Sequence, residues 1–351
     1  MGASAVNITT VGIDSAKNVF HVHAIDERGK VLVRKQLKRD QVGRFFANVP
    51  PCLIGMEACA SSHHWGRMLQ GFGHTVRLMA PQFVKPYVKS NKNDMADAEA
   101  ICEAVTRPNM RFVPIKSVEQ QSVLSLHRVR QGFVKARTAQ ANQIRGLLGE
   151  MGLVIPQGIR FIAQRVPALL EDASNELPLA FRQLIERLTN HLKLLDEQVD
   201  AIHSQIVAWD RSCELSQKLQ KIPGIGPLTS TALIATVADV HSFKSGRQMS
   251  AWLGLVPRQK SSGGKPTLLG ISKRGDVYLR TLLIHGARAA IVAAKHRTSG
   301  RESSWLAKLL DRRHLNVAAV ALANKNARTV WALLAHGRDF DPAYKPVRAV
   351  A

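Results

Sequence analysis

The sequence contains 351 residues, a length that suggests about two domains, each long enough to bury a hydrophobic core. Hydrophobic residues make up 45% of it and charged residues 21%, which is typical of a globular protein and excludes an intrinsically disordered one. Lys and Arg number 49 against 26 Asp and Glu, so the formal net charge is +23 at pH 7. This excess favours a polyanionic partner: nucleic acid, an anionic membrane surface or another polyanion.

A membrane is the weaker of these alternatives. The longest apolar stretches, residues 289–294 and 317–323, are much shorter than the roughly 18 residues of a spanning helix. The first ten residues lack the cationic and apolar regions of a signal peptide. Four cysteines form no CxxC pair and are expected to be reduced: Cys52, Cys59, Cys102 and Cys213. We therefore expect a cytosolic protein without a membrane partner.

Composition divides the chain into three expected domains: residues 1–115, 116–220 and 221–351. The third carries 21 basic and 6 acidic side chains, whereas the first two have net charges of only +6 and +2. A solvated basic face explains a single cluster of cations but not a whole region with this excess. The distribution therefore predicts nucleic-acid binding by residues 221–351.

Residues 1–115 show short strands followed by alternating helices and strands. Residues 6–13 form a β-rich segment that ends at Asp14, residues 18–25 alternate between apolar and polar side chains, and residues 31–37 follow a turn. These three segments predict an antiparallel meander. The further expected elements are a helix over 40–48, a buried strand over 52–57 that ends at Glu57, a helix capped by Ser61 or Ser62, a strand over 74–80 and a helix that begins near Asp94.

This order of elements is that of a ribonuclease H-like fold, in which Asp14 and Glu57 end neighbouring central strands. Asp94 and Asp97 are spaced i,i+3 and share one face of their helix. Four converging carboxylates repel one another unless a divalent cation such as Mg²⁺ or Mn²⁺ is bound. Each acid has a structural alternative, as a helix cap, a turn residue or a solvated side chain. The actin-like ATPase fold begins similarly, but its glycine-rich phosphate loops are missing from residues 50–115.

The middle of the chain is helical. Apolar residues recur at helical spacing over residues 119–151, and a Pro/Gly-containing break over 155–158 separates this helix from a second one. The second helix carries a heptad seam of Leu188, Leu192, Leu195, Val199, Ile202, Ile206 and Trp209. The seam either packs on the preceding helix within the chain or pairs with another protomer as a coiled coil. We favour the second alternative, which makes residues 116–220 a coiled-coil and oligomerisation region.

The basic third region begins with a Pro-Gly-Ile-Gly turn. In KIPGIGPLTSTAL, Gly224 and Gly226 precede a helix of small residues, as in helix-hairpin-helix modules, where backbone N–H groups approach a phosphate. A plain helix-turn-helix corner is the alternative. We expect further phosphate contacts from Lys273, Arg274 and Arg280, at the start and along the continuation of a later helix.

Two serines lie in a polar segment between cations. Ser261 and Ser262 precede Gly263 and Gly264, and Arg258, Lys260 and Lys265 flank them. Such a segment is usually a flexible linker loop. The alternative is a serine hydroxyl that acts as a nucleophile towards a phosphate held by the surrounding cations.

The chain resembles transposases of the insertion sequence 110 family, and in particular its 1111 subgroup. The resemblance rests on several long motifs in one order: VGIDSAKNVFHVHAID, GMEACASSHHW, NKNDMADAEAICEAV, KIPGIGPLTSTAL, GLVPRQKSSGGK and LGISKRGDVYLRTLLIHGAR. It implies a RuvC-like domain whose metal-binding and catalytic acids are Asp14, Glu57, Asp94 and Asp97. It also implies a nucleophilic serine before a glycine, which is Ser262 or, one position earlier, Ser261.

Members of this family are thought to form a phosphoserine intermediate with DNA. They recombine the ends of the element with a target, guided by a structured non-coding bridge RNA that pairs with both DNAs. The resemblance thus implies double-stranded DNA, a guide RNA, Mg²⁺ or Mn²⁺ and a homodimer or homotetramer. The alternatives are a RuvC-type junction nuclease that uses metal-activated water, and a non-catalytic nucleic-acid-binding protein. The expected fold is α/β plus α: a ribonuclease H-like mixed sheet, a helical coiled-coil middle and a mainly helical basic domain with a helix-hairpin-helix-like motif.

Overall fold

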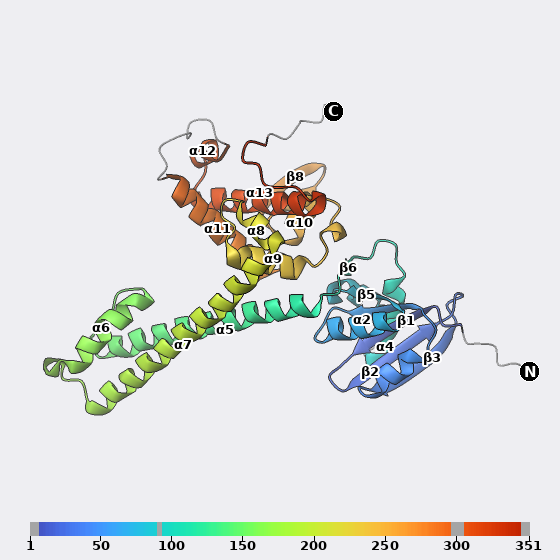
Figure 1. Ribbon diagram of the computed structural model, residues 1–351, viewed down its shortest axis with the longest axis horizontal. Coiled ribbons are helices and arrows are strands. Elements are labelled where there is room, and N and C mark those ends of the chain that lie inside the picture. The colour runs from blue at the N-terminus through green and yellow to red at the C-terminus, as the bar shows by residue number, and fades with distance from the viewer. Residues whose placement is uncertain (1–6, 90–92, 296–304, 345–351) are drawn as a thin grey trace, which may run out of the picture. The chain divides into compact units, whose positions relative to one another are not determined.

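The computed structural model describes residues 7–89, 93–295 and 305–344 (Figure 1). Residues 1–6, which belong to the segment expected not to be a signal peptide, lie outside the described residues. Two compact units are present: Met1–Glu119 with Val237–Ser242, and Gln120–Thr236 with Phe243–Ala351. Because residues from both sides of position 220 belong to the second unit, the expected division of the chain at that position stays a prediction.

The first unit is built on a six-stranded sheet in the order β3-β2-β1-β4-β5-β6. The strands are β1 (Thr10–Ser15), β2 (Val19–Ile25), β3 (Val31–Lys38), β4 (Leu53–Glu57), β5 (Thr75–Met79) and β6 (Phe112–Val113). β2 pairs antiparallel with β1 and β3, which confirms the expected meander. β1 pairs parallel with β4, and β4 pairs parallel with β5, so β1 and β4 are neighbouring central strands, as predicted.

Helices cover both faces of this sheet. They are α1 (Gln41–Ala47), α2 (Ser62–Gly71), α3 (Pro81–Val84), the 3-10 helix η1 (Lys85–Tyr87) and α4 (Asp94–Val105). α4 packs against β1, β2 and β4, whereas α2 packs through Trp65 against Phe20, on the opposite face of β2 from His21. Ser61 occupies the N-cap position of α2, as expected, but no serine side chain caps the helix. Ser61 makes no capping hydrogen bond, and the Ser62 hydroxyl donates to the Cys59 carbonyl instead.

Three helices of the second unit pack side by side: α5 (Val118–Glu150), α6 (Ile159–Glu171) and α7 (Leu179–Ser212). The 3-10 helix η2 (Ala173–Asn175) lies between α6 and α7. Ile185 and Leu192 of α7 are buried against Ile144 and Ile162, and Arg137 of α5 forms an ion pair of 2.7 Å with Asp196. Leu188 and Leu192 of the expected heptad seam thus pack against α5 and α6 of the same chain, and pairing of the seam with another protomer stays a prediction.

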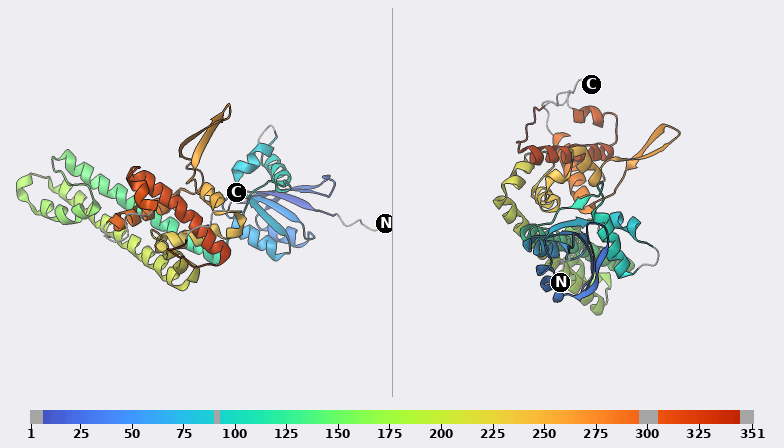
Figure 2. Two further views of the ribbon diagram at one scale, coloured as in Figure 1. Left: turned by 90° about the horizontal axis from the view of Figure 1, so that it is seen from above. Right: turned by 90° about the vertical axis from the view of Figure 1, so that its right-hand side faces the viewer.

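The remaining elements of the second unit include one isolated hairpin. They are α8 (Glu214–Gln220), α9 (Pro227–Val237), α10 (Gly246–Trp252), β7 (Pro257–Ser262), β8 (Lys265–Ile271), α11 (Val277–Lys295), α12 (Trp305–Leu310) and α13 (Leu315–His336). The short η3 (Val240–Ser242) belongs to the first unit. α11 packs on α13, and Leu279, Leu283 and Ile291 are fully buried there. Figure 2 shows β7 and β8 as an arm that projects from the helices of this unit.

One helix reaches the length and mean hydropathy of a membrane span, although it contains no uninterrupted apolar run of that length. Residues Val277–Ala294 of α11 meet both criteria. The segment nevertheless carries Arg280 and Arg288, and its buried residues recur four apart on the side that packs against neighbouring helices. This pattern is also that of a core helix in a water-soluble protein.

Candidate metal centre and serine hairpin

Asp14 lies near the carboxyl end of β1, on the face of the sheet that α4 covers. Side chains alternate along a strand, so Asp14 projects to the same side as Gly12. A Cβ atom at Gly12 would lie 2.1 Å from the Ala98 carbonyl oxygen and 2.4 Å from the Cys102 amide nitrogen. The glycine therefore allows α4 to approach β1 closely, and this approach brings the first turn of α4 towards Asp14.

Asp94 and Asp97 occupy the first turn of α4. Asn93 caps this helix, because its side-chain oxygen accepts a hydrogen bond of 2.8 Å from the Ala96 amide. Carboxylates at a helix N-terminus are stabilised by the unpaired N–H groups and the helix dipole. The expected alternative, in which Asp94 itself is the cap, is thus wrong: Asp94 is the first helical residue.

Three of the four expected acids come together. Asp14, Asp94 and Asp97 each offer a carboxylate oxygen, and these oxygens all lie within 4.8 Å of one another. Asp14 and Asp97 are partly buried and Asp94 is exposed. Burial raises the pKa of Asp14 above its ordinary value, and the charges of Asp97 and Asp94 raise it further. The cluster therefore combines oxygen ligands with unfavourable like-charge repulsion, which a bound divalent cation relieves.

Glu57 lies close by in the fold but outside this cluster. The last paired residues of the parallel β1–β4 ladder are Ile13 and Met56, so Asp14 and Glu57 are the next residues on adjacent strands. Both are partly buried. The structure confirms the placement of Glu57 at the end of the neighbouring strand but does not include its carboxylate in the group within 4.8 Å.

His21 is a neighbour of the acids that the sequence analysis missed. It faces Asp14 directly in the β1–β2 ladder, and its Nδ1 lies 3.8 Å from Oδ2 of Asp94. The sequence did contain a signal for this contact. His21 follows Asp14 by seven residues across a short turn, on a strand whose apolar and polar side chains alternate, so it could be expected to face Asp14 in the hairpin.

The segment around the two serines is a hairpin, so the expectation of a flexible loop is wrong. Ser261 pairs with Pro266 and Ser262 with Lys265, across a two-residue turn. Gly263 and Gly264 have φ angles of +57° and +74°, which is the backbone of a tight hairpin turn and is disfavoured for other residues. Arg258, Lys260 and Lys265 are all exposed on this arm.

The family of the chain follows from its similarity to other proteins. Residues 11–152 match a family model described as a transposase, and residues 216–302 match one described as the transposase IS116/IS110/IS902 family. The chain is 51% identical over 345 residues to a probable family 20 transposase of Pseudomonas aeruginosa, covering 97% of this chain and 100% of the relative. The chain belongs to the IS110 family of transposases.

Two further relatives of this transposase are named for the insertion sequences that encode them. The transposase for IS1111A of Coxiella burnetii is 46% identical, over 94% of this chain and 91% of the relative. The transposase for IS1328 of Yersinia enterocolitica is 44% identical, over 95% of this chain and 99% of the relative. The chain is thus an IS1111-like member and an enzyme that cuts and rejoins DNA, which excludes the alternative of a non-catalytic binding protein.

Two of the transposase's expected phosphate-binding groups have packing roles. Arg280 is only 8% exposed, and its Nη1 donates hydrogen bonds of 3.1 Å to the carbonyls of Leu253 and Arg274. The expectation that Arg280 contacts DNA is therefore wrong, because its guanidinium is used inside the fold. A Cβ at Gly224 would lie 2.7 Å from the carbonyl of Gly286, so this glycine allows close packing on α11.

The other expected contacts of the basic region remain available. Lys273 and Arg274 are exposed and precede α11 rather than belonging to it. Gly226 has open space where a side chain would be, next to the start of α9. A role of these residues, or of Gly224, in phosphate binding stays a prediction.

Proposed function

We propose that this transposase cuts DNA at the acidic cluster and forms a covalent phosphoserine link through Ser262. The observation that carries the proposal is the convergence of three carboxylate oxygens within 4.8 Å, at the end of β1 and the start of α4, in an IS110-family chain. An all-oxygen ligand set of this kind fits Mg²⁺ or Mn²⁺, and a bound cation would offset the burial and the like charges that raise the pKa of Asp14.

The chemistry divides between the acids and the serine. Asp14, Asp94 and Asp97, with Glu57 as the fourth acid, would hold the cation and thereby position the scissile phosphate. A bound divalent cation polarises the phosphodiester and stabilises charge on the attacking and leaving oxygens. The Ser262 Oγ forms a bond to phosphorus and loses its proton to solvent, while the P–O bond to the leaving strand breaks and solvent protonates the departing oxygen. Attack by a DNA hydroxyl then rejoins a strand and releases the serine.

Hydrogen bonding favours Ser262 over Ser261 as the nucleophile. The Ser261 hydroxyl accepts a hydrogen bond of 2.8 Å from the side-chain amide of Gln259. Among the described residues, no hydrogen-bond partner engages the Ser262 hydroxyl, which also lies directly beside the glycine turn and opposite Lys265. The register implied by the family motif and the local hydrogen bonding thus agree.

The remaining parts of the proposal concern the partners. We propose that Arg258, Lys260, Lys265, Lys273 and Arg274 contact the backbones of the element ends and the target. A structured guide RNA would provide sequence recognition, as in other guided nucleases, because the chain shows no familiar base-reading module. We also propose that the transposase acts as a homodimer or homotetramer in the prokaryotic cytoplasm at the nucleoid.

Covalent trapping on a suicide DNA substrate tests the serine route. With Mg²⁺ or Mn²⁺ present, the wild type should leave a protein–DNA adduct, and Ser262→Ala should abolish it while Ser261→Ala retains it. The reverse result would move the nucleophile to Ser261. Cleavage without any adduct in the wild type would replace the serine route by a junction nuclease that uses activated water. Asp14→Asn should abolish cleavage in every case.

The guide is tested separately from the chemistry. Purified transposase should carry one specific small RNA transcribed beside its gene, and the removal of this RNA should abolish the choice of target. A preparation without RNA that still recombines the same sites would contradict the guide but leave the serine mechanism intact.

A further inference from the structure

A hollow of about 620 Å³ lies at one end of the sheet of the first unit. Asn18 of the β1–β2 turn, Lys38 at the end of β3, Arg39 just after it, and His64 and Trp65 of the first turn of α2 all contribute to its lining. The hollow thus joins three segments that are distant in sequence. Neither the acidic cluster nor the serine hairpin uses any of these side chains.

The hollow and the acidic cluster lie at the same end of strands β1, β2 and β3, on opposite faces of the sheet. Asp14 faces His21 across the β1–β2 ladder, and Val19, two residues earlier on β2, faces Lys38 of β3. Two residues along a strand span about 7 Å. The cluster lies on the face of the sheet that α4 covers, and the hollow lies on the face that α2 covers. A DNA strand that passes over the ends of these β-strands can therefore reach both.

Arg39 is held in place at the hollow, and neither it nor Lys38 has a carboxylate partner among the described residues. Nη1 of Arg39 donates a hydrogen bond of 3.1 Å to the Lys17 carbonyl, and the guanidinium lies 5.1 Å from the centre of the Trp65 ring. Trp65 is only 4% exposed and provides a rigid support for this arginine. Lys38 is exposed. Asp40 also lines the hollow, yet within the described residues neither Lys38 nor Arg39 forms an ion pair with it.

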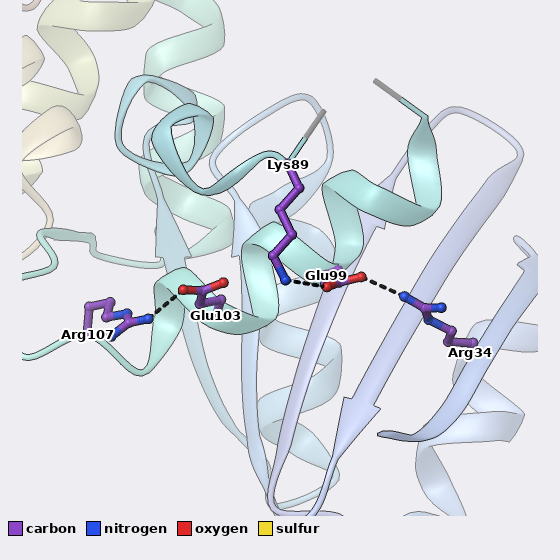
Figure 3. A network of polar contacts seen from close by, with 5 residues as sticks. All are labelled: Arg34, Lys89, Glu99, Glu103 and Arg107. Carbon is purple, nitrogen blue, oxygen red and sulfur yellow. Dashed lines mark hydrogen bonds and ion pairs between the residues drawn. The ribbon is translucent and has the colours of Figure 1, made fainter. Parts of the chain in front are cut away.

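Three other cations of the same unit are instead paired with carboxylates. Arg34 and Lys89 are paired with Glu99, and Arg107 is paired with Glu103 (Figure 3). The cations of the hollow therefore retain their capacity for an external anion. A fixed guanidinium, an exposed ammonium, an amide and an imidazole in one hollow suit the phosphates of a nucleic-acid backbone.

We propose that this hollow binds the DNA strand that continues from the phosphate held at the acidic cluster, with Lys38 and Arg39 contacting backbone phosphates. This inference rests on the proposed function, since it takes the acidic cluster as the place where DNA is cut. Bound in this way, the DNA strand is fixed both at the acidic cluster and in the hollow, which aligns the scissile phosphate before the reaction.

Lysine footprinting of the full-length transposase, as purified and in EDTA, tests the contact without catalysis. Acetylation of Lys38 should fall several-fold when a duplex spanning one end of the element is added. Lys30, in the turn at the opposite end of β2 and β3, should react equally with and without DNA. Protection of Lys260 and Lys265 alone would overturn the proposed hollow but not DNA binding by the transposase. Protection nowhere would overturn both, and protection of Lys38 by RNA before DNA is added would assign the hollow to RNA instead.

A matched pair of charge reversals provides the second test. Lys38→Glu/Arg39→Glu should weaken DNA binding in EDTA roughly five- to tenfold and lower the salt-dependence slope by roughly 1.5 to 2 units, as expected for two lost phosphate contacts. Arg28→Glu/Lys30→Glu changes the charge equally in the exposed turn at the other end of the strands. Equal weakening by both variants would reduce the effect to net charge and overturn the proposal. Circular dichroism establishes that each variant is folded.

Discussion

Nη2 of Arg34 on β3 lies 2.6 Å from Oε2 of Glu99 on α4, so this ion pair joins the helix that carries two of the clustered acids to the sheet (Figure 3). Lys89 approaches the other oxygen of the same carboxylate at 2.9 Å. The hydrogen bond from Lys89 lowers the pKa of Glu99 below its ordinary value. Glu99 follows Asp97 by two residues, so its anchoring bears directly on the acidic cluster.

Glu99→Gln should weaken metal binding more than it weakens folding. Exposed ion pairs of this type contribute about 0.5 kcal/mol, so the melting temperature should change little. The loss of the anchor should let the first turn of α4 move and lower the Mn²⁺ affinity several-fold, measured by calorimetric titration. Because the folded-state pKa is lowered, the stabilisation is present above the ordinary value of 4.5 and is lost as the pH falls through the folded value.

Glu103→Gln is the matched control for Glu99→Gln. Glu103 lies on the same helix but pairs with Arg107 four residues later, without linking α4 to the sheet. Its Mn²⁺ affinity should equal that of the wild type. Equal affinities of the two variants would show that the link to β3 does not position the acids.

Gly12→Ala should separate α4 from β1. The added carbon would meet backbone atoms of Ala98 and Cys102 at 2.1 and 2.4 Å, and backbone of a helix cannot yield as a side chain does. We expect a destabilisation of about 3 kcal/mol, at the upper end of overpacking effects, and a loss of Mn²⁺ binding. Urea unfolding monitors the first effect. Gly71→Ala, with open space around the added carbon, should leave both unchanged, and a Gly12→Ala protein of wild-type stability would contradict the packing argument.

The first unit was the part most accessible to prediction. Alternating apolar residues and short turns indicated β1, β2 and β3, and the order of elements predicted that β1 and β4 are neighbours. Convergence of Asp14 with Asp94 and Asp97 followed from this order. The position of the Glu57 carboxylate outside the cluster could not be predicted from the order of elements, because it depends on side-chain geometry at the end of β4 rather than on the sequence pattern.

The serine hairpin and Arg280 show where pattern reasoning fails. Every residue of β7 is exposed, so hydropathy gives an arm of this kind the same pattern as a loop. The Gly-Gly pair was the available signal for a hairpin turn. Arg280 is buried because the carbonyls of Leu253 and Arg274 satisfy its guanidinium, and only the tertiary structure brings these partners to α11.

Asp14→Asn should abolish DNA cleavage yet stabilise the metal-free protein. The folded-state pKa of Asp14 is raised above the ordinary value of 3.8, so the ionised side chain opposes folding as the pH rises through the folded value, and this cost is fully present at neutral pH. Solvent screening of a half-exposed group keeps it small, and we expect the melting temperature in EDTA to rise by about 1–2 °C.

Adding metal should reverse which of the two proteins, Asp14→Asn or the wild type, has the higher melting temperature. Mn²⁺ should raise the melting temperature of the wild type, because it binds the folded state, and should leave Asp14→Asn nearly unchanged. Glu27→Gln, in the exposed β2–β3 turn, serves as the control and should behave as the wild type in both conditions. A lower melting temperature of Asp14→Asn in EDTA would contradict the cost of burying the ionised Asp14 beside Asp97 and Asp94.

His127 should make the second unit sensitive to mild acid. Its ring nitrogens bond to the Tyr278 hydroxyl at 2.9 Å and the Thr231 hydroxyl at 3.0 Å, and burial lowers its pKa to about 4. Since the folded-state pKa lies below the ordinary 6.5, the stabilisation from neutral His127 is fully present above pH 6.5 and is lost as the pH falls towards 4, by roughly 3 kcal/mol at most.

Two variants test the role of His127. In urea unfolding between pH 7 and 4, His127→Gln should lose most of the pH dependence of the unfolding free energy. Tyr278→Phe, which removes one hydrogen bond but keeps the imidazole, should be less stable by about 1 kcal/mol with the dependence retained. An unchanged pH profile in His127→Gln would assign the acid sensitivity to another group, such as His23 of the first unit, whose pKa burial also lowers.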